Sequence, residues 1–245
     1  MTYVDSSNVA FLIVDGYNLL GVSTGITDEG LERETVEKLY LGDTLRRKKL
    51  TGVSKAGAIT QQGSFDDAAG SSHIVLQAGG SDRVLSYALA GNTIGKHFVG
   101  AVCDQVAYEP TLVAGDFTEA NARYNITQHE SGLLLTTLQT VVADGDTEAS
   151  AVDNLALSNG GGVAYLQCTA LALGGYTDLT VTVRHSADGI VWALLEAFAD
   201  VAAIGGERIV VADDPINRYL AVDWTFNGAG VAPSATFVVG FYRNE

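Results

Sequence analysis

The segment His185-Ser186-Ala187-Asp188-Gly189 holds the three residue types of a hydrolytic triad within four positions. In a triad the carboxylate orients the histidine and the histidine activates the hydroxyl, so three side chains must converge from different directions. Close neighbours in sequence do not meet that requirement. Ser-Ala-Asp-Gly is instead typical of a turn between two strands, because Ser and Asp bond to nearby backbone and Gly tolerates positive φ. We therefore predict a hairpin turn here and no catalytic residues.

Metal sites and phosphate loops are also not indicated. The four histidines lie in unrelated segments, at His73, His97, His129 and His185. Asp144-Gly145-Asp146 with Glu148 lacks the loop length and the closing glutamate of an EF-hand, so an acidic linker is the better interpretation. Gly160-Gly161-Gly162 precedes a predicted strand, whereas a phosphate-binding loop needs a helix N-terminus. We expect no metal and no cofactor.

We interpret the cysteines and tryptophans as structural residues. Cys103 and Cys168 lie far apart, each in an apolar run, which predicts two separate buried thiols and no disulfide. Trp192 and Trp224 could form a sugar-binding platform, but burial in a core or an interface is the preferred role.

Short apolar runs separated by Gly, Asn and Asp extend through the 245 residues, with 28 glycines and only 3 prolines. This pattern predicts a mainly β fold of antiparallel strands. The clearest signal is Asp15-Gly16 between two apolar runs, because both central residues of a type I′ turn need positive φ. Further strands are expected at 82–90, 97–105, 108–112, 120–127, 163–173, 177–185, 207–212, 217–226 and 234–243.

Two short helices are also expected. One spans about 66–78, is capped by Asp66 and ends at Gly79-Gly80. The other covers 193–203, where Ala, Leu and Glu favour helix. Each precedes a glycine pair and a strand that begins with an acid and an arginine, so a duplication is one interpretation of the chain. We place a domain boundary in the polar stretch 144–150, which gives residues 1–145 and 146–245 as two β-domains.

Charge is segregated in one stretch of the first domain. Acidic residues from Asp28 to Glu37 are followed by four basic residues. We predict two long strands, about 26–40 and 44–62, around a turn near Gly42-Asp43; a helix over 28–40 is the alternative. Either a solvated loop or a contact between stacked subunits would explain the charges. The candidate contact residues are Glu32, Glu34, Glu37, Arg46, Arg47, Lys48 and Lys49.

The formal net charge of −15 argues against ordinary nucleic-acid binding, because such a surface repels phosphates. A negative charge of this size would keep the protein soluble, and it would also suit a surface along which DNA passes without binding. The first residues show no signal peptide and no apolar run is long enough for a membrane span, so we expect a soluble, cytoplasmically made protein.

Several segments resemble the major tail tube proteins of long-tailed phages and tailed archaeal viruses. In the first half these are Phe11 to Leu20, Leu41-Gly42-Asp43, Thr51 to Lys55, Gly63 to Asp67 and Gly91 to Gly95. In the second half Val181 to Trp192, Asn217 to Leu220 and Phe237 to Phe241 also look like virion structural proteins.

The resemblance implies a β-sandwich or barrel with a short flanking helix, which assembles into stacked, β-lined rings. It implies a structural virion protein of the tail, without enzymatic activity, whose partners are further copies of itself and other tail proteins. A tube-like domain in each half would give trimeric, pseudo-sixfold rings, and the shared order of the two halves favours this duplication. One tube domain with a decoration domain would give hexamers. The alternative function is a capsid or tail decoration module, or a receptor- or glycan-binding β-sandwich.

Overall fold

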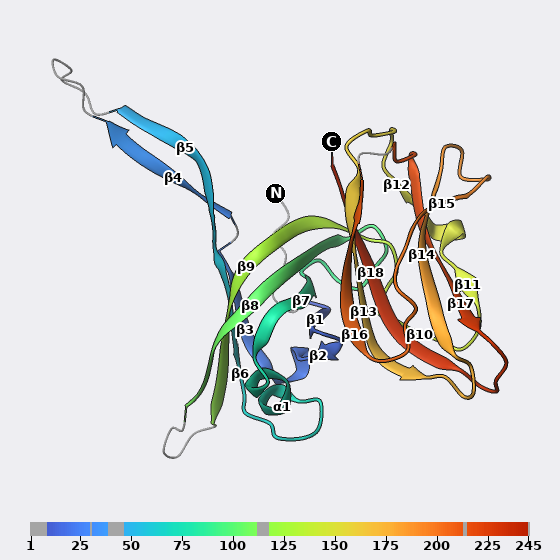
Figure 1. The fold of residues 1–245 in the computed structure, drawn as a ribbon, viewed down its shortest axis with the longest axis horizontal. Coiled ribbons are helices and arrows are strands. Elements are labelled where there is room, and N and C mark those ends of the chain that lie inside the picture. Colours follow the sequence, from blue (N-terminus) through green and yellow to red (C-terminus); the bar gives the residue numbers. More distant parts are fainter. Residues whose placement is uncertain (1–8, 30, 39–46, 112–117, 213–214, 245) are drawn as a thin grey trace.

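The computed structural model describes residues 9–29, 31–38, 47–111, 118–212 and 215–244, and in 31–38 and 47–56 it describes the backbone. Figure 1 shows two β-rich lobes side by side and a two-stranded hairpin that projects from one of them. We call strands β1–β3 and β6–β9 with helix α1 the first lobe, strands β10–β18 the second lobe, and the hairpin β4–β5 the arm. The mainly β, antiparallel fold predicted from the sequence is confirmed.

The first hairpin is as predicted. Strand β1 (Phe11–Val14) turns through Asp15 and Gly16, with φ of 48° and 83°, into β2 (Tyr17–Asn18). A short 3-10 turn (Leu20–Val22) follows. A Cβ on Gly16 would lie 2.5 Å from the carbonyl oxygen of Cys168, so glycine also permits the close approach of the second lobe.

One curved antiparallel sheet forms the first lobe, in the order β3-β6-β9-β8-β7-β1-β2. Its remaining strands are β3 (Ser23–Asp28), β6 (Ala58–Gly63), β7 (Gly80–Ala88), β8 (His97–Thr111) and β9 (Glu119–Leu134). The two strands expected at 97–105 and 108–112 are a single strand, with register shifts beside Cys103 and Ala107. The concave side buries Leu12, Leu85 and Tyr124 against Leu76 of α1.

Helix α1 (Ser72–Gln77) is shorter than expected, and the predicted Asp66 cap is wrong. The N-cap is Ser71, without a side-chain cap hydrogen bond. Asp66 instead accepts hydrogen bonds from the Ala68 amide and the Ser71 hydroxyl, 2.9 Å each, in a turn before the helix. This local bonding competes with helix formation. The chain leaves the helix at Gly79 and Gly80, both with positive φ, as predicted.

The second lobe is a β-sandwich. One layer has β16 (Gly205–Val211), β13 (Gly162–Ala172), β18 (Ser234–Arg243) and β10 (Gln139–Val141). The other has β17 (Tyr219–Asn227), β14 (Asp178–Ser186) and β15 (Ala193–Ala197), with the two-residue strands β11 (Gly145–Asp146) and β12 (Val152–Asp153) on β17. A 3-10 turn (Glu148–Ser150) links β11 to β12. The core between the layers includes Val183, Trp224 and Phe237.

The helix expected at 193–203 is wrong. Residues 193–197 form β15, and the chain then continues along β14, since the Phe198 amide donates to the Val181 carbonyl and the Val201 amide to the Leu179 carbonyl. Phe198 is buried in the sandwich core. Tertiary pairing and this burial outweigh the helix preference of Ala, Leu and Glu. The duplication interpretation relied on one short helix in each half. The described part of the second lobe has no such helix at 193–203.

A separate core joins the lobes. The sheets meet where β18 pairs with the end of β9, at Gly240–Leu134 and Phe241–Leu133. Apolar side chains from both lobes pack there, and at Gly100 and Gly240 a Cβ would collide with the rings of Tyr165 and Phe98. Glycine in these strands therefore lets aromatic rings lie flat across the junction.

The arm consists of β4 (Leu31–Lys38) and β5 (Arg47–Ala56), which pair with each other and with no other described strand. Each predicted long strand is thus two consecutive strands, β3 with β4 and β5 with β6, and the helix alternative over 28–40 is wrong. The expected turn at Gly42-Asp43 lies outside the described residues.

Candidate assembly surface

The arm places its charged residues in a defined register. Glu32 lies opposite Lys55, and Glu37 lies opposite Lys48. Opposite charges at facing positions stabilise a β-ladder, and the register sets a basic residue across the arm from each of these two acids.

The outer part of the arm is unbalanced in charge. Lys38 lies opposite Arg47, and Lys49 lies opposite the apolar Val36. Like charges at facing positions are unfavourable in an isolated hairpin. Glu34 falls at the register shift between Arg33 and Thr35, and Arg46 lies outside the described residues. In the described outer part of the arm the register therefore places four basic residues, Lys38, Arg47, Lys48 and Lys49, and a single acid, Glu37.

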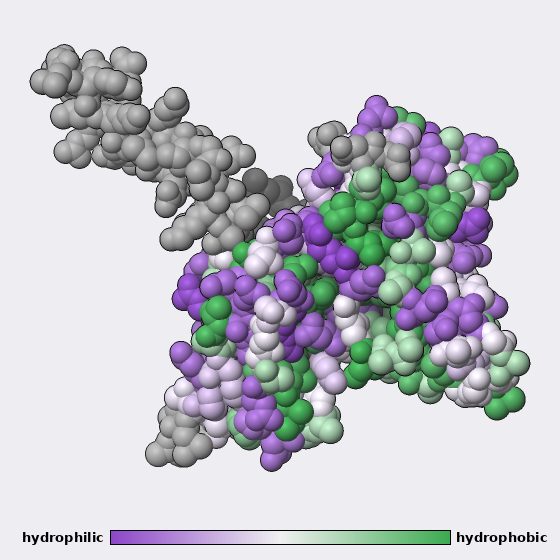
Figure 2. All heavy atoms as spheres, in the orientation of Figure 1, coloured by the Kyte–Doolittle hydropathy of each residue, from purple (hydrophilic) through white to green (hydrophobic). Residues whose placement is uncertain are grey.

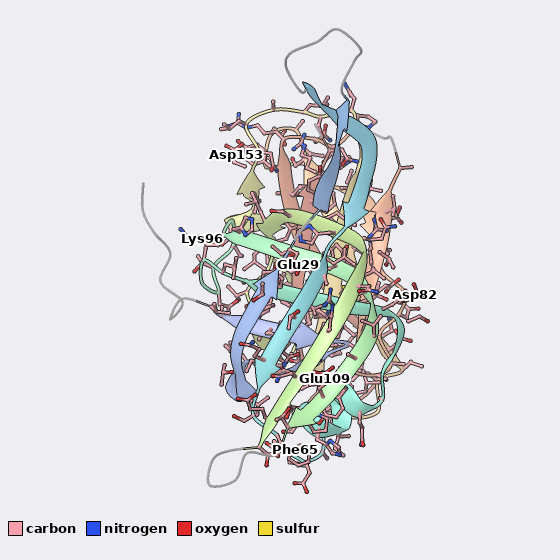
Figure 3. All side chains as sticks on the ribbon, turned by 90° about the vertical axis from the view of Figure 1, so that its left-hand side faces the viewer. Glu29, Phe65, Asp82, Lys96, Glu109 and Asp153 are labelled. Carbon is pink, nitrogen blue, oxygen red and sulfur yellow. The ribbon has the colours of Figure 1, made fainter. Side chains whose placement is uncertain are left out.

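Hydrogen bonds fix the base of the arm to the first lobe. The Glu29 amide donates to the Ala58 carbonyl, and the Glu29 carboxylate accepts from the Ala58 amide at 3.1 Å. The Ile126 amide of β9 donates to the Gly57 carbonyl. Figure 3 shows Glu29 at this base, where the strands of the arm enter the sheet. The arm is thus a continuation of the sheet.

A small polar cluster lies next to the base. The Asp28 carboxylate, at the end of β3, accepts hydrogen bonds from the Tyr87 hydroxyl of β7 and from His129 Nε2 of β9, the latter at 2.8 Å. Burial and the adjacent Asp28 raise the pKa of Tyr87, so the phenol stays protonated and donates. The hydrogen bond to Asp28 raises the pKa of His129 above its usual value, although burial opposes the shift.

The pair predicts a pH dependence. Because the folded-state pKa of His129 is raised, its stabilisation is complete below the unfolded-state pKa of about 6.5 and is lost as pH rises through the folded-state pKa. We expect the melting temperature of the native protein to fall between pH 6.5 and pH 8.5 by more than that of His129→Gln. Differential scanning calorimetry across this range tests this, and equal slopes for both proteins would contradict it.

Each of the four histidines contacts a different residue. His73 contacts Tyr108, His97 contacts Ser131, His129 contacts Asp28, and His185 accepts from the Asn217 amide. Within the described ranges no group of three or more His, Cys, Asp or Glu residues could hold a metal ion.

Ser186 and Asp188 form the predicted turn. The Ser186 hydroxyl donates to Asp188 Oδ1 at 3.0 Å and accepts from the Gly189 amide. Asp188 in turn accepts the amides of Ile190 and Val191, both at 2.9 Å. The backbone bonds lower the pKa of Asp188. All of this bonding is internal to the loop between β14 and β15.

A cleft of about 700 Å³ between the lobes contains one serine–histidine contact that sequence spacing does not suggest. His97 Nε2 lies 2.6 Å from the Ser131 hydroxyl. Register explains the contact, since His97 faces Leu133 and Ser131 faces Val99 on adjacent strands, which makes them diagonal neighbours. In the described part of the chain no carboxylate bonds to His97, so the orienting member of a triad is missing there. Figure 2 shows apolar side chains over the upper part of the second lobe, beside the boundary with the first.

Both cysteines are free and buried, as predicted. Burial raises the pKa of Cys103 to about 12 and that of Cys168 to about 11. Trp224 is buried in the second lobe and its indole N–H donates to the Ala143 carbonyl at 2.9 Å, whereas Trp192 is half-buried in the loop before β15. Among the described helices none has the length and apolar character to cross a membrane.

No protein-family model and no curated protein matches the sequence. Among solved structures, the chain is similar to the Dit (gp 19.1) protein of SPP1, a hub of the adsorption apparatus in phages that infect Gram-positive bacteria, with a TM-score of 0.38 and 9% identity over 95% of this chain and 99% of that chain. It is also similar to a structure of infectious bursal disease virus, Gt strain, with a TM-score of 0.25 and 11% identity over 98% of this chain and 74% of that one. At these identities and TM-scores the likenesses carry no argument about function.

Proposed function

We propose that this chain is a structural subunit of a viral tail, whose copies join through the arm into stacked rings that conduct viral DNA without binding it specifically. The observation that carries the proposal is the arm itself. A two-stranded hairpin that pairs with nothing else in the described chain is marginally stable alone. Its charges and open edges gain most from contact with a second subunit.

The placement of the resembling segments supports the same proposal. The strand-turn-strand segment Phe11–Leu20 forms β1 and β2 of the first lobe, and Thr51–Lys55 belongs to β5 of the arm. The first lobe and the arm thus hold these segments that resemble a tail tube domain. The second lobe, a sandwich with its own core, suits an appended decoration domain. We therefore favour hexameric rings over trimers with pseudo-sixfold symmetry.

Reversal of the basic cluster tests the role of the arm. We expect replacement of Arg46, Arg47, Lys48 and Lys49 by Glu to abolish polymers while the subunit stays folded, because reversed charges would repel the acidic surface of a neighbour. Negative-stain electron microscopy of native and variant protein, across a salt and concentration series, measures the outcome. Circular dichroism provides the folding control.

The native protein decides between the proposal and its alternative. Hollow tubes or stacked rings would support a tail conduit and give the ring symmetry directly. Small particles at every salt and concentration would contradict the proposal and favour a decoration or binding module. If the charge-reversed variant forms normal polymers, the proposed role of the arm in assembly is contradicted.

A further inference from the structure

The sheet of the second lobe ends in an open strand. β15 pairs with β14 on one side and with no other described strand on the other. Leu194 of β15 is 61% exposed, and Ile190 and Val191 in the preceding loop are 79% and 72% exposed. An exposed edge of this kind is a template for pairing with another chain unless the fold protects it.

The loop before β15 is held rigidly in this exposed form. As described above, the Asp188 carboxylate binds the amides of both Ile190 and Val191. The loop is therefore ordered before any partner arrives, which lowers the conformational cost of docking.

Carboxylates flank the apolar centre of this edge. Asp188 lies at one end, and Glu196, Asp200 and Glu207 follow toward the other. None of the four forms an ion pair with a described residue, and the nearby Arg184 is paired with Glu148 and Asp223. The half-buried Glu207 accepts the Ala199 amide, and burial raises its pKa. A basic partner would compensate these charges.

The sequence of β5 has the complementary order. Basic residues 47–49 precede the apolar Leu50 and Val53, and Lys55 follows. Acidic residues thus flank an apolar centre along the edge of β15, and basic residues flank an apolar centre along β5. The facing pair Lys38–Arg47 leaves the outer arm with basic charge that its own ladder does not balance.

We propose that β5 of one chain adds to the open β15 edge of the second lobe in another copy of this chain. Figure 1 places the arm and β15 on opposite sides of the molecule, so the contact joins two different copies. Because the two surfaces differ, the contact is heterologous and repeats head to tail, which closes into rings or continues as filaments. The inference rests on the proposed self-assembly and identifies its receiving surface.

Cross-linking between two differently tagged chains tests the contact directly. One chain carries Leu194→Cys and the other Thr51→Cys, and a short bismaleimide joins thiols that lie close together. The native thiols are buried and protonated, so they do not react. We expect a hetero-cross-link for this pair and none when Val106→Cys, on an exposed site of β8, replaces Leu194→Cys.

Charge reversal at the edge provides a second readout. We expect Glu196→Lys with Asp200→Lys to weaken assembly, measured by sedimentation, by on the order of tenfold or more. Lys48→Glu with Lys49→Glu in the same chain should restore it. The matched control, Asp67→Lys with Glu109→Lys, makes the same change in net charge at exposed sites. Figure 3 shows Glu109 toward the end of the first lobe opposite the arm.

The outcomes separate the two proposals. Rings that form without the cross-link, and that tolerate reversal at Glu196 and Asp200, would overturn the β15 contact and leave ring assembly intact. A chain that stays monomeric at every concentration would overturn both. A cross-link together with charge-swap rescue would establish β15 as the receiving edge.

Discussion

Replacement of Asp15 by alanine is expected to lower the free energy of unfolding by about 4 kcal/mol. Arg83 is 6% exposed, and its Nε donates to Asp15 Oδ2 at 2.7 Å. The same guanidinium donates to the Val75 carbonyl of α1 and to Gln105 of β8, so it ties the first hairpin to the helix and the sheet. Without Asp15 the buried cation would lose its carboxylate, and alanine would have to adopt a φ of 48°.

Two further variants separate these causes. Asp15→Asn keeps an oxygen for the Val84 amide, which now donates to Asp15 Oδ1 at 2.8 Å, and asparagine tolerates positive φ. We expect Asp15→Asn to lower the free energy of unfolding by about 2 kcal/mol, which is the contribution of the carboxylate charge. Asp15→Gly also removes the carboxylate, but glycine adopts a positive φ without strain. We therefore expect its loss in free energy of unfolding to be smaller than that of Asp15→Ala by the cost of the positive φ. Urea denaturation measures all three, and native stability of Asp15→Asn would contradict the role of the ion pair.

The second large effect is expected at Gln167, a fully buried amide between the lobes. Its Oε1 accepts the Gly16 amide at 2.9 Å, and its Nε2 donates to the Val84 carbonyl and the Ser86 hydroxyl. Gln167→Leu would keep the volume and leave the Gly16 amide and Ser86 without this partner. We expect a loss of about 3 kcal/mol, since each unsatisfied buried polar group costs about 1–3 kcal/mol.

The loss should change how the protein unfolds. Each lobe has its own apolar core, and the junction couples them. A weakened junction is expected to split one urea transition into two, seen as a lower apparent m-value and as different midpoints by tryptophan fluorescence and circular dichroism. Gln62→Leu, on an exposed site of β6, is the matched control and should change stability little. A single unchanged transition in Gln167→Leu would contradict the coupling.

Local turn chemistry made much of this fold predictable. Asp15-Gly16 dictates a hairpin because few residues accept positive φ, and Ser186 to Gly189 dictates a turn because its side chains bond its own backbone. The same reasoning gave a wrong prediction for the segment 193–203. Its residues favour helix, whereas pairing with β14 and burial of Phe198 in the sandwich core favour an extended chain. Neither of these tertiary contacts is visible in local sequence.

The candidate assembly surface was predictable in composition and not in geometry. The segregated charges of the arm are plain in the sequence, but a register shift at Glu34 decides which residues face each other. The open edge of β15 was hidden by the expected helix. Gln167 and Arg83 gave no local signal, because their partners lie up to 151 residues away.

The attachment of the arm has a mechanical consequence. Its strands run on into β3 and β6, and β6 is bonded along its length to both β3 and β9. A pull along the arm would load these ladders in shear, so that their hydrogen bonds resist together, whereas a sideways pull would open them one after another. A neighbour that holds the arm lengthwise would therefore transmit tension into the sheet of the first lobe, and the joint would be stiff in the direction of the load and compliant across it.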